Sequence, residues 1–352
     1  MGGWGKELRI GQNPAKMRGS PAYTPKRVGV ASLTYVPVLE GYWREAPDVI
    51  RVHLESLRLT SPGCDLCVFD NGSCPQVIDF LEGQWREGLI DWLCVSHHNL
   101  GKNGALNWIF SAMPNEYIGY SDSDILYRSG WLERSLEIFA AFEKAGMVSA
   151  SPVFFDFLRG QGKTAQAIAA TPGLEVRTVT PDPSVIDEYC DGINATPEQR
   201  QQFHQTRLQV AFNQHNGARA VTSATDMQFM LSKKVARQLV PLPIAGALTA
   251  KDAIDIPRGI EDLGYWILSS DEHLVRHMGN TILGRAIPEI DAYLSRVSTA
   301  RTPDSQPAAS SSGTKKRLFA WLQKQVDRSP GLRRRLVRVY DSLFGLLFEE
   351  RR

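Results

Sequence analysis

Apolar residues in the first half of the chain recur at two different spacings, which predict strands and helices in alternation. Short apolar runs typical of buried strands occur at 27–36, 64–70, 90–97 and 117–126. Segments with helical spacing lie between and after them, at 47–59, 75–88, 104–113 and 130–145. Strands that alternate with helices of about 10–15 residues predict parallel pairing with right-handed crossovers. We therefore expect an α/β fold with a mostly parallel, Rossmann-like sheet flanked by helices.

The second half is patterned less evenly. A strand is predicted at 147–155, and ordered patterns return at 224–231 and 259–270. Residues 156–220 mix Gly, Pro, Gln and charged side chains with little periodicity. We expect this stretch to be an insertion or an acceptor-binding region.

Composition shifts mark the domain boundaries. Residues 1–26 are rich in Gly, Pro and Lys/Arg and predict a flexible arm, and the Ser/Pro/Ala-rich stretch 298–314 predicts a linker. The folded domain is therefore assigned to 27–297. A tail of amphipathic helices is predicted at 315–352.

The tail differs from the body in charge. Residues 315–352 carry eleven Lys/Arg and four Asp/Glu, a net of +7, which leaves −5 for residues 1–314 out of the total of +2. Two helical pieces separate at Ser329-Pro330, which is a favoured helix start. Basic amphipathic helices suit an anionic membrane surface. Docking on the body or on a second subunit fits the same pattern, as does disorder.

Overall composition indicates an ordinary soluble protein with no nucleic-acid partner. Apolar residues make up 43% and charged residues 22% of the 352 positions. The five cysteines form neither a disulfide framework nor a zinc pattern, so we expect reduced thiols. No apolar run reaches the ~18 residues that span a bilayer, and the N-terminus lacks the apolar core of a signal peptide. We expect a cytoplasmic protein, peripheral on the inner face of the membrane if the tail binds lipid. Its oligomeric state is open.

Two aspartates end the fourth predicted strand, in the sequence YSDSDIL. Residues two apart on a strand point to the same side, so Asp122 and Asp124 converge if the extended geometry continues. Two carboxylates repel unless a cation or a proton lies between them. Hard oxygen donors suit Mg²⁺ or Mn²⁺, although a solvated turn is the plainer alternative.

Further polar residues follow the other predicted strands. Asp70 and Asn71 end the second strand and are suited to a ribose or base edge, or to a simple Asn-Gly turn. Lys102 lies in NLGKNGALN, where glycines beside a lysine before a helix suit phosphates. Because parallel strands end at one edge of a sheet, these residues are expected to lie together.

The order VGVASLTYV, CVFDNGS, NLGKNGALN, YSDSDIL and GIEDLGYWIL resembles family 2 glycosyltransferases of GT-A fold, over about residues 27–290. The resemblance implies that Thr34, Asp70, Asn71, Lys102 and Asp122 bind a nucleoside diphosphate sugar. It implies that Asp124, Asp122 and His277 hold the metal.

The same resemblance makes Asp262 the catalytic base, with Glu261 beside it. A base is needed because a neutral hydroxyl is a poor nucleophile, and a metal would neutralise the leaving diphosphate. We expect an inverting, single transfer to a glycan or lipid-linked acceptor. A nucleotidyltransferase and a non-catalytic nucleotide-sugar-binding protein are the alternatives. The sequence does not name the sugar, the nucleotide or the acceptor.

Overall fold

The computed structural model describes residues 23–153, 163–244 and 255–282. The predictions for residues 1–22, for the linker and for the basic tail lie outside the described residues. The last part of the predicted N-terminal arm is attached to the body. Tyr23 Oη donates to Asp65 Oδ2 at 2.5 Å, and the Lys26 backbone N–H donates to the same oxygen at 2.9 Å.

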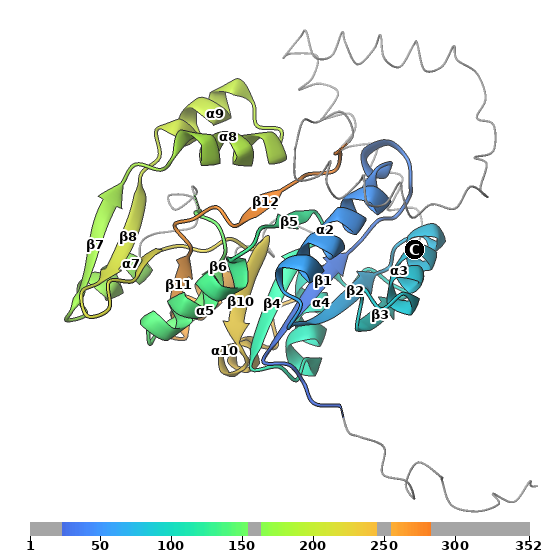
Figure 1. The fold of residues 1–352 in the computed structure, drawn as a ribbon, viewed down its shortest axis with the longest axis horizontal. Helices are drawn as coiled ribbons and strands as arrows, with labels where there is room; N and C mark the ends of the chain where they lie inside the picture. The colour runs from blue at the N-terminus through green and yellow to red at the C-terminus, as the bar shows by residue number, and fades with distance from the viewer. Residues whose placement is uncertain (1–22, 154–162, 245–254, 283–352) are drawn as a thin grey trace, which may run out of the picture. The chain divides into compact units, whose positions relative to one another are not determined.

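One ten-stranded sheet organises the chain, in the order β3-β2-β1-β4-β10-β6-β11-β9-β8-β7 (Figure 1). Its first part consists of parallel strands β1 (Val28–Thr34), β2 (Asp65–Asn71), β3 (Trp92–Ser96) and β4 (Tyr117–Asp122). The crossover helices are α2 (Ala46–Thr60), α3 (Pro75–Arg86) and α4 (Gly101–Ala112), with a short helix η1 (Gly41–Trp43) before α2. The alternation predicted from the sequence is confirmed here.

A reversed strand joins the two parts of the sheet. Strand β10 (Gln228–Ser232) is antiparallel to β4 and also to β6 (Ala145–Ser149). Strand β11 (Trp266–Ser269) is parallel to β6. Strands β1, β4, β6 and β11 therefore all end at the same edge of the sheet, and β10 begins there. We call this edge the carboxyl edge.

A separate two-stranded sheet lies next to this edge. It consists of β5 (Ile125–Tyr127) and β12 (Val275–His277), which pair antiparallel with His277 opposite Ile125. Helix α5 (Trp131–Ala141) follows β5 and leads into β6. The predicted strand 117–126 is thus two strands, with Ser123 and Asp124 at the break.

Residues 163–221 form regular structure, contrary to the irregular stretch expected from the sequence. They contain α7 (Lys163–Ala169), β7 (Leu174–Val179), α8 (Pro183–Gly192), α9 (Pro197–His204), β8 (Leu208–Asn213) and β9 (Arg219–Val221). Periodicity missed them because the elements are short and partly exposed. Local signals were present: Asp182 and Thr196 cap α8 and α9, each followed by Pro at the first helical position.

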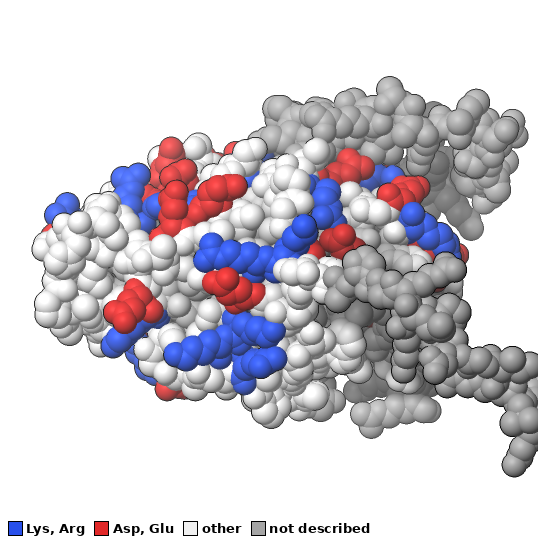
Figure 2. Space-filling view, turned by 60° about the horizontal axis from the view of Figure 1, so that its bottom comes forward, with Lys and Arg blue, Asp and Glu red and all other residues white. Residues whose placement is uncertain are grey.

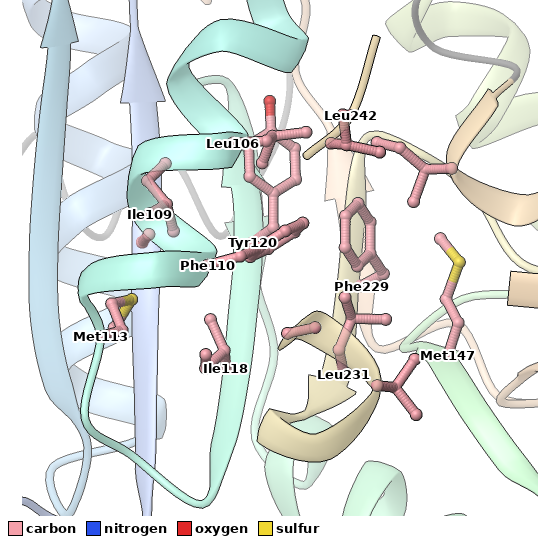
Figure 3. Packing of buried hydrophobic residues seen from close by; sticks show 14 of the residues in the cluster. Leu106, Ile109, Phe110, Met113, Ile118, Tyr120, Met147, Phe229, Leu231 and Leu242 are labelled. Atoms are coloured by element: carbon pink, nitrogen blue, oxygen red, sulfur yellow. The ribbon is translucent and has the colours of Figure 1, made fainter. Parts of the chain in front are cut away.

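Strand alternation distributes the core over both faces of the sheet. Val28 and Val30 face α2 and α3, whereas Ala31 faces α4. Figure 3 shows the second of these cores, where Phe110 of α4 packs with Tyr120 and Phe229. Helices α10 (Lys233–Leu239) and α11 (Asp255–Asp262) complete this layer. Each large apolar side chain buried in this way contributes about 1.5–3 kcal/mol.

Three further features concern the surface charges, the cysteines and the length of the helices. On the face in Figure 2, acidic and basic side chains are interspersed and do not form a patch of one sign. All five cysteines are free thiols. Among the described residues, no helix is both long enough and apolar enough to cross a bilayer.

Candidate active site

Lys102 stands between two acidic residues at the carboxyl edge. Its Nζ lies 3.3 Å from Asp122 Oδ1 and 3.6 Å from Asp226 Oδ2, and it donates to the Asp226 carbonyl oxygen at 2.8 Å. The Tyr120 ring lies beneath the ammonium group, 4.9 Å from Nζ to the ring centroid. Lys102 thus neutralises part of the charge that two neighbouring carboxylates bring.

Asp122 is held in one orientation by the end of β4. Tyr120 Oη donates to Asp122 Oδ1 at 2.5 Å, and the Asp122 backbone N–H donates to Met227 O at 2.8 Å. Burial raises the pKa of Tyr120, and the nearby Asp122 charge raises it further. The phenol therefore stays a donor at neutral pH and fixes the carboxylate.

The loop before α4 positions Lys102, and Asn71 holds this loop. Asn71 Nδ2 donates to Asn99 Oδ1 at 3.0 Å and to Gly101 O at 3.3 Å, and Asn71 Oδ1 accepts from the Leu100 N–H at 2.8 Å. Gly101 has φ +71°, which favours glycine. Asn71 is almost fully buried. Its role in this structure is to position Lys102, whereas the nucleotide contact expected from the sequence stays a prediction.

Asp124 and His277 form a second cluster beside Asp122. His277 Nε2 lies 3.3 Å from Asp124 Oδ2, and the Met278 N–H donates to Asp124 O at 2.8 Å. Burial raises the pKa of the Asp124 carboxyl, and the positive form of His277 opposes the shift. Asp124 Oδ1 and His277 Nδ1 are both buried without a hydrogen-bond partner among the described residues. Buried polar atoms are normally hydrogen-bonded, so these two atoms are exceptions that call for an explanation.

This cluster fits a divalent cation. A carboxylate oxygen without a partner next to an imidazole is a donor set that Mn²⁺ or Mg²⁺ accepts. No group of three or more His, Cys, Asp or Glu suited to a metal occurs in the described part of the chain. A cation here would therefore take its remaining ligands from a bound molecule or from water.

Two cavities lie near the Asp124–His277 cluster. The larger, about 200 Å³, is lined by Asp124 and by the aromatic residues Tyr35, Tyr42 and Trp43. The smaller, about 30 Å³, has both His273 and His277 in its wall. Asp124 therefore lines the aromatic cavity, and its neighbours Ile125 and His277 line the smaller one.

Thr34 and Asp70 lie side by side at the ends of β1 and β2. Both are fully buried. Asp70 accepts from the Ser73 N–H with both oxygens, at 3.1 and 2.9 Å, and burial raises its pKa while these bonds oppose the shift. Thr34 Oγ1 has no hydrogen-bond partner among the described residues. Asp70 therefore closes a turn, and the nucleotide contacts predicted for both residues stay predictions.

Glu261 and Asp262 lie at the other edge of the sheet, which corrects their expected place. They end α11, and the chain then enters the amino end of β11, where Trp266 is opposite Ala145. Asp122 is at the far end of β4, level with the carboxyl ends of β6 and β11. The structure therefore does not bring Asp262 to the aspartate pair, and the role of base has no geometric support.

The two acidic residues have structural partners instead. Glu261 Oε1 accepts from Thr164 N at 3.0 Å and from Thr164 Oγ1 at 2.7 Å, which caps the start of α7. Asp262 Oδ1 pairs with Lys163 Nζ at 2.9 Å, and both side chains are more than half exposed.

Asp226 is a site residue that sequence reasoning missed. It comes two residues before the apolar strand β10, and only 6% of its surface is exposed. An acidic residue just before a strand indicates this site only if the strand is known to be antiparallel to β4. The sequence alone does not give the direction of β10.

Comparison with known proteins gives one family match. Residues 42–189 match the family described as glycosyl transferase family 2. Among solved structures, TarS 1-349 of S. aureus is similar at 12% identity and a TM-score of 0.41, covering 71% of this chain and 59% of that one. Mannosyltransferase PcManGT from Pyrobaculum calidifontis, in complex with GDP-Man and Mn²⁺, is similar at 15% identity and 0.41, covering 88% and 83%. A search of curated proteins found no match.

Proposed function

Because residues 42–189 match glycosyl transferase family 2, we propose that the chain moves a sugar from a nucleoside diphosphate sugar to an acceptor hydroxyl. One observation carries this proposal. Asp122, Asp124, Lys102 and His277 converge at the carboxyl edge, where open α/β sheets bind their ligands. The family match sets aside the nucleotidyltransferase.

The cluster suits a diphosphate leaving group. Lys102 can donate to a phosphate oxygen, since two of its present partners are carboxylates that a diphosphate would replace or share. Charge develops on the diphosphate as the anomeric bond breaks, and fixed cations stabilise it. A single displacement by the acceptor oxygen inverts the configuration at the anomeric carbon.

Asp124 and His277 would hold the divalent cation, Mn²⁺ or Mg²⁺. When bound, the metal supplies Lewis-acid stabilisation of the leaving diphosphate. Since the described residues offer too few ligands for a closed site, we expect the metal to bind tightly only together with the donor diphosphate. Asp122 would keep its contacts with Lys102 and Tyr120 and orient the donor.

The aromatic cavity is the proposed donor site. Tyr35 and Tyr42 are both exposed at its wall, and Tyr42 packs edge-on against Trp43 with ring centroids 5.3 Å apart. Flat faces of this kind stack with a nucleobase, for about 1–3 kcal/mol per base. Its proximity to Asp124 would place the diphosphate next to the metal position.

Calorimetry with a panel of nucleoside diphosphate sugars, with Mn²⁺ and with chelator, tests the donor and the metal together. We expect Mn²⁺ alone to bind weakly and a matching nucleoside diphosphate to increase its affinity. Asp124→Asn should abolish that increase. Asp79→Asn, an exposed acidic residue on α3, is the control and should leave it unchanged. Equal Mn²⁺ affinity with and without nucleotide in all three proteins would contradict the metal assignment.

A lipid-linked or glycan acceptor at a membrane is the proposed cellular context. It rests on the charge of residues 315–352, a net +7 against −5 for the rest of the chain. Each basic residue near an anionic surface contributes about 1 kcal/mol, screened by salt. Co-sedimentation of the full chain with anionic liposomes at low and high salt tests this. Salt-independent absence of binding would favour docking on protein.

A further inference from the structure

Three side chains from distant parts of the chain lie in a row beside the small cavity. Ser151 Oγ lies 2.6 Å from His273 Nδ1, and His273 Nε2 lies 2.9 Å from Glu188 Oε2. The second contact is short in distance, although its angle departs from ideal hydrogen-bond geometry. Ser151 follows β6, His273 precedes β12, and Glu188 is on α8.

The position of Glu188 favours one tautomer of the His273 ring. A carboxylate only accepts hydrogen bonds, so the tautomer that places the proton on Nε2, 2.9 Å from Glu188 Oε2, is the favoured one. In that tautomer Nδ1 accepts a hydrogen bond from the Ser151 hydroxyl. Many general bases have this arrangement. A carboxylate orients the imidazole, and the other ring nitrogen faces a hydroxyl.

Two guanidinium groups share the Glu188 carboxylate with His273. Arg128 Nη2 lies 2.9 Å from Glu188 Oε2 and Arg276 Nη1 lies 3.8 Å from Glu188 Oε1. The His273 hydrogen bond, followed by the Arg128 charge and bond, lowers the pKa of Glu188 to about 2, against its burial. Glu188 therefore stays ionised. An ionised Glu188 can pair with the imidazolium that forms when His273 takes a proton.

The small cavity places this row next to the proposed metal position. Ser151, His273 and His277 all line it, and His277 contacts Asp124 at 3.3 Å. Its volume of about 30 Å³ exceeds the ~10–15 Å³ that one water molecule needs on the same measure. It therefore has room for a hydroxyl group. The rest of an acceptor would lie outside, towards α8.

Helix α8 supplies the orienting carboxylate and is tied to β12 at its other end. A Cβ added to Gly192 would lie 2.2 Å from His277 O. Glycine therefore permits the close approach that brings Glu188 over His273. In Figure 1, α8 lies with α9 beside β12, away from the parallel strands β1 to β4.

We propose that His273 is the general base that deprotonates the acceptor hydroxyl, and that Glu188 is its positioning residue. The proposal rests on the proposed glycosyl transfer. It assigns to the segment between β6 and β10 a direct part in the chemistry. It also replaces Asp262, which lies at the opposite edge.

The acceptor hydroxyl enters the small cavity and donates to His273 Nδ1, while the Ser151 hydroxyl rotates away from that nitrogen. The acceptor oxygen forms a bond to the anomeric carbon of the donor, and the bond from that carbon to the diphosphate oxygen breaks. Its electron pair leaves with the diphosphate. The hydroxyl proton passes to Nδ1, and the imidazolium pairs with Glu188 until solvent takes the proton.

Release of nucleoside diphosphate from the bound donor, with water as acceptor, gives an assay that needs no identified acceptor. His273→Gln should lower kcat by about 10²–10⁴-fold, the usual contribution of a general base, while calorimetric donor affinity stays within about twofold of the wild type, since the base acts in the transition state. Added imidazole should restore part of the rate to His273→Ala. Glu188→Gln should lower kcat by a smaller factor, with donor affinity unchanged.

Two further variants separate this role from a structural one. Ser151→Ala should lower kcat by a much smaller factor than His273→Gln does, because Nδ1 then faces the cavity directly. Asp187→Asn, next to Glu188 but paired with Arg200 and His204 of α9, is the matched control and should behave as wild type. Circular dichroism and melting temperature verify that each variant folds.

Several outcomes would overturn the proposal. His273→Gln with a wild-type rate would exclude His273 as base, and so would His273→Ala that folds but is not restored by imidazole. Loss in Ser151→Ala equal to that in His273→Gln would exclude direct proton transfer. These failures differ from failure of the proposed function, in which the wild type would bind no donor.

Discussion

His53 gives a prediction whose size follows from the structure. It is fully buried on α2, where Nδ1 lies 2.7 Å from Ile125 O and Nε2 lies 2.9 Å from Ser32 Oγ. It thereby connects α2 and β1 to the residue after Asp124. Burial lowers its pKa from 6.5 to about 4, against the bond to Ile125.

The sign of the pH effect follows from this shift. The folded pKa is below the unfolded one, so below pH 6.5 the unfolded chain binds a proton at His53 that the folded chain does not. The free energy of unfolding therefore decreases as pH falls from about 6.5 towards 4. A shift from 6.5 to about 4 corresponds to about 3 kcal/mol in total, with about 2 kcal/mol already lost at pH 5.

Urea denaturation of wild type and His53→Asn, at pH 7.5 and at pH 5, measures the contribution of His53 to the free energy of unfolding. Asparagine can still donate to Ile125 O but does not titrate. We expect His53→Asn to be less stable than wild type at pH 7.5, because Ser32 loses its partner. The difference between the two proteins should shrink by about 2 kcal/mol at pH 5. A difference that is the same at both pH values would refute the reasoning, since His53 would then not be the group that titrates.

Three other outcomes follow from contacts in the site. Asp262→Asn and Glu261→Ala should both keep donor turnover, and only Glu261→Ala should lower stability, by about 1 kcal/mol, because it removes the acceptor for Thr164 N and Oγ1. Turnover assays and thermal melts check this, and an inactive Asp262→Asn would restore the base role predicted from sequence. Gly72→Ala should weaken donor binding in calorimetry, because a Cβ there would lie 3.0 Å from Asn99 N at φ +90°, whereas Gly63→Ala has open space and should not. Lys102→Met should lose donor affinity and about 2 kcal/mol of stability in urea denaturation, since it leaves two carboxylates without their shared cation; unchanged binding would remove Lys102 from the donor site.

The parallel half of the fold was predictable because each signal is local. Strands such as β1 and helices such as α2 follow from apolar spacing, and their alternation fixes parallel pairing. Parallel strands end at one edge, which is why Lys102 and Asp122 could be expected to meet. His277 reaches Asp124 through the pairing of β12 with β5, which the sequence alone does not give.

The remainder depends on the directions of elements and on contacts between distant segments. Glu261-Asp262 was assigned by the resemblance, but a helix that precedes a parallel strand ends at the amino edge, so α11 carries them away from Asp122. Asp226 reaches the site because β10 is reversed. The side chain of Asn71 could bind a ligand, yet it is hydrogen-bonded to the loop before α4. Local patterns contain none of this information.

The reversed strand β10 also has a consequence for protein engineering. β6 and β10 are antiparallel neighbours in the sheet, so everything between Ser149 and Gln228 is, topologically, the connection of a hairpin. Gln228 Oε1 accepts from the Ala150 N–H at 2.8 Å and holds the entry and exit of this connection together. A segment that leaves and re-enters the sheet at neighbouring points can be exchanged without changing helix α4, which carries Lys102, or strand β4, which carries Asp122. The fold is therefore suited to chimaeras in which one donor-binding body, with Asp226 retained, is combined with different excursions between β6 and β10.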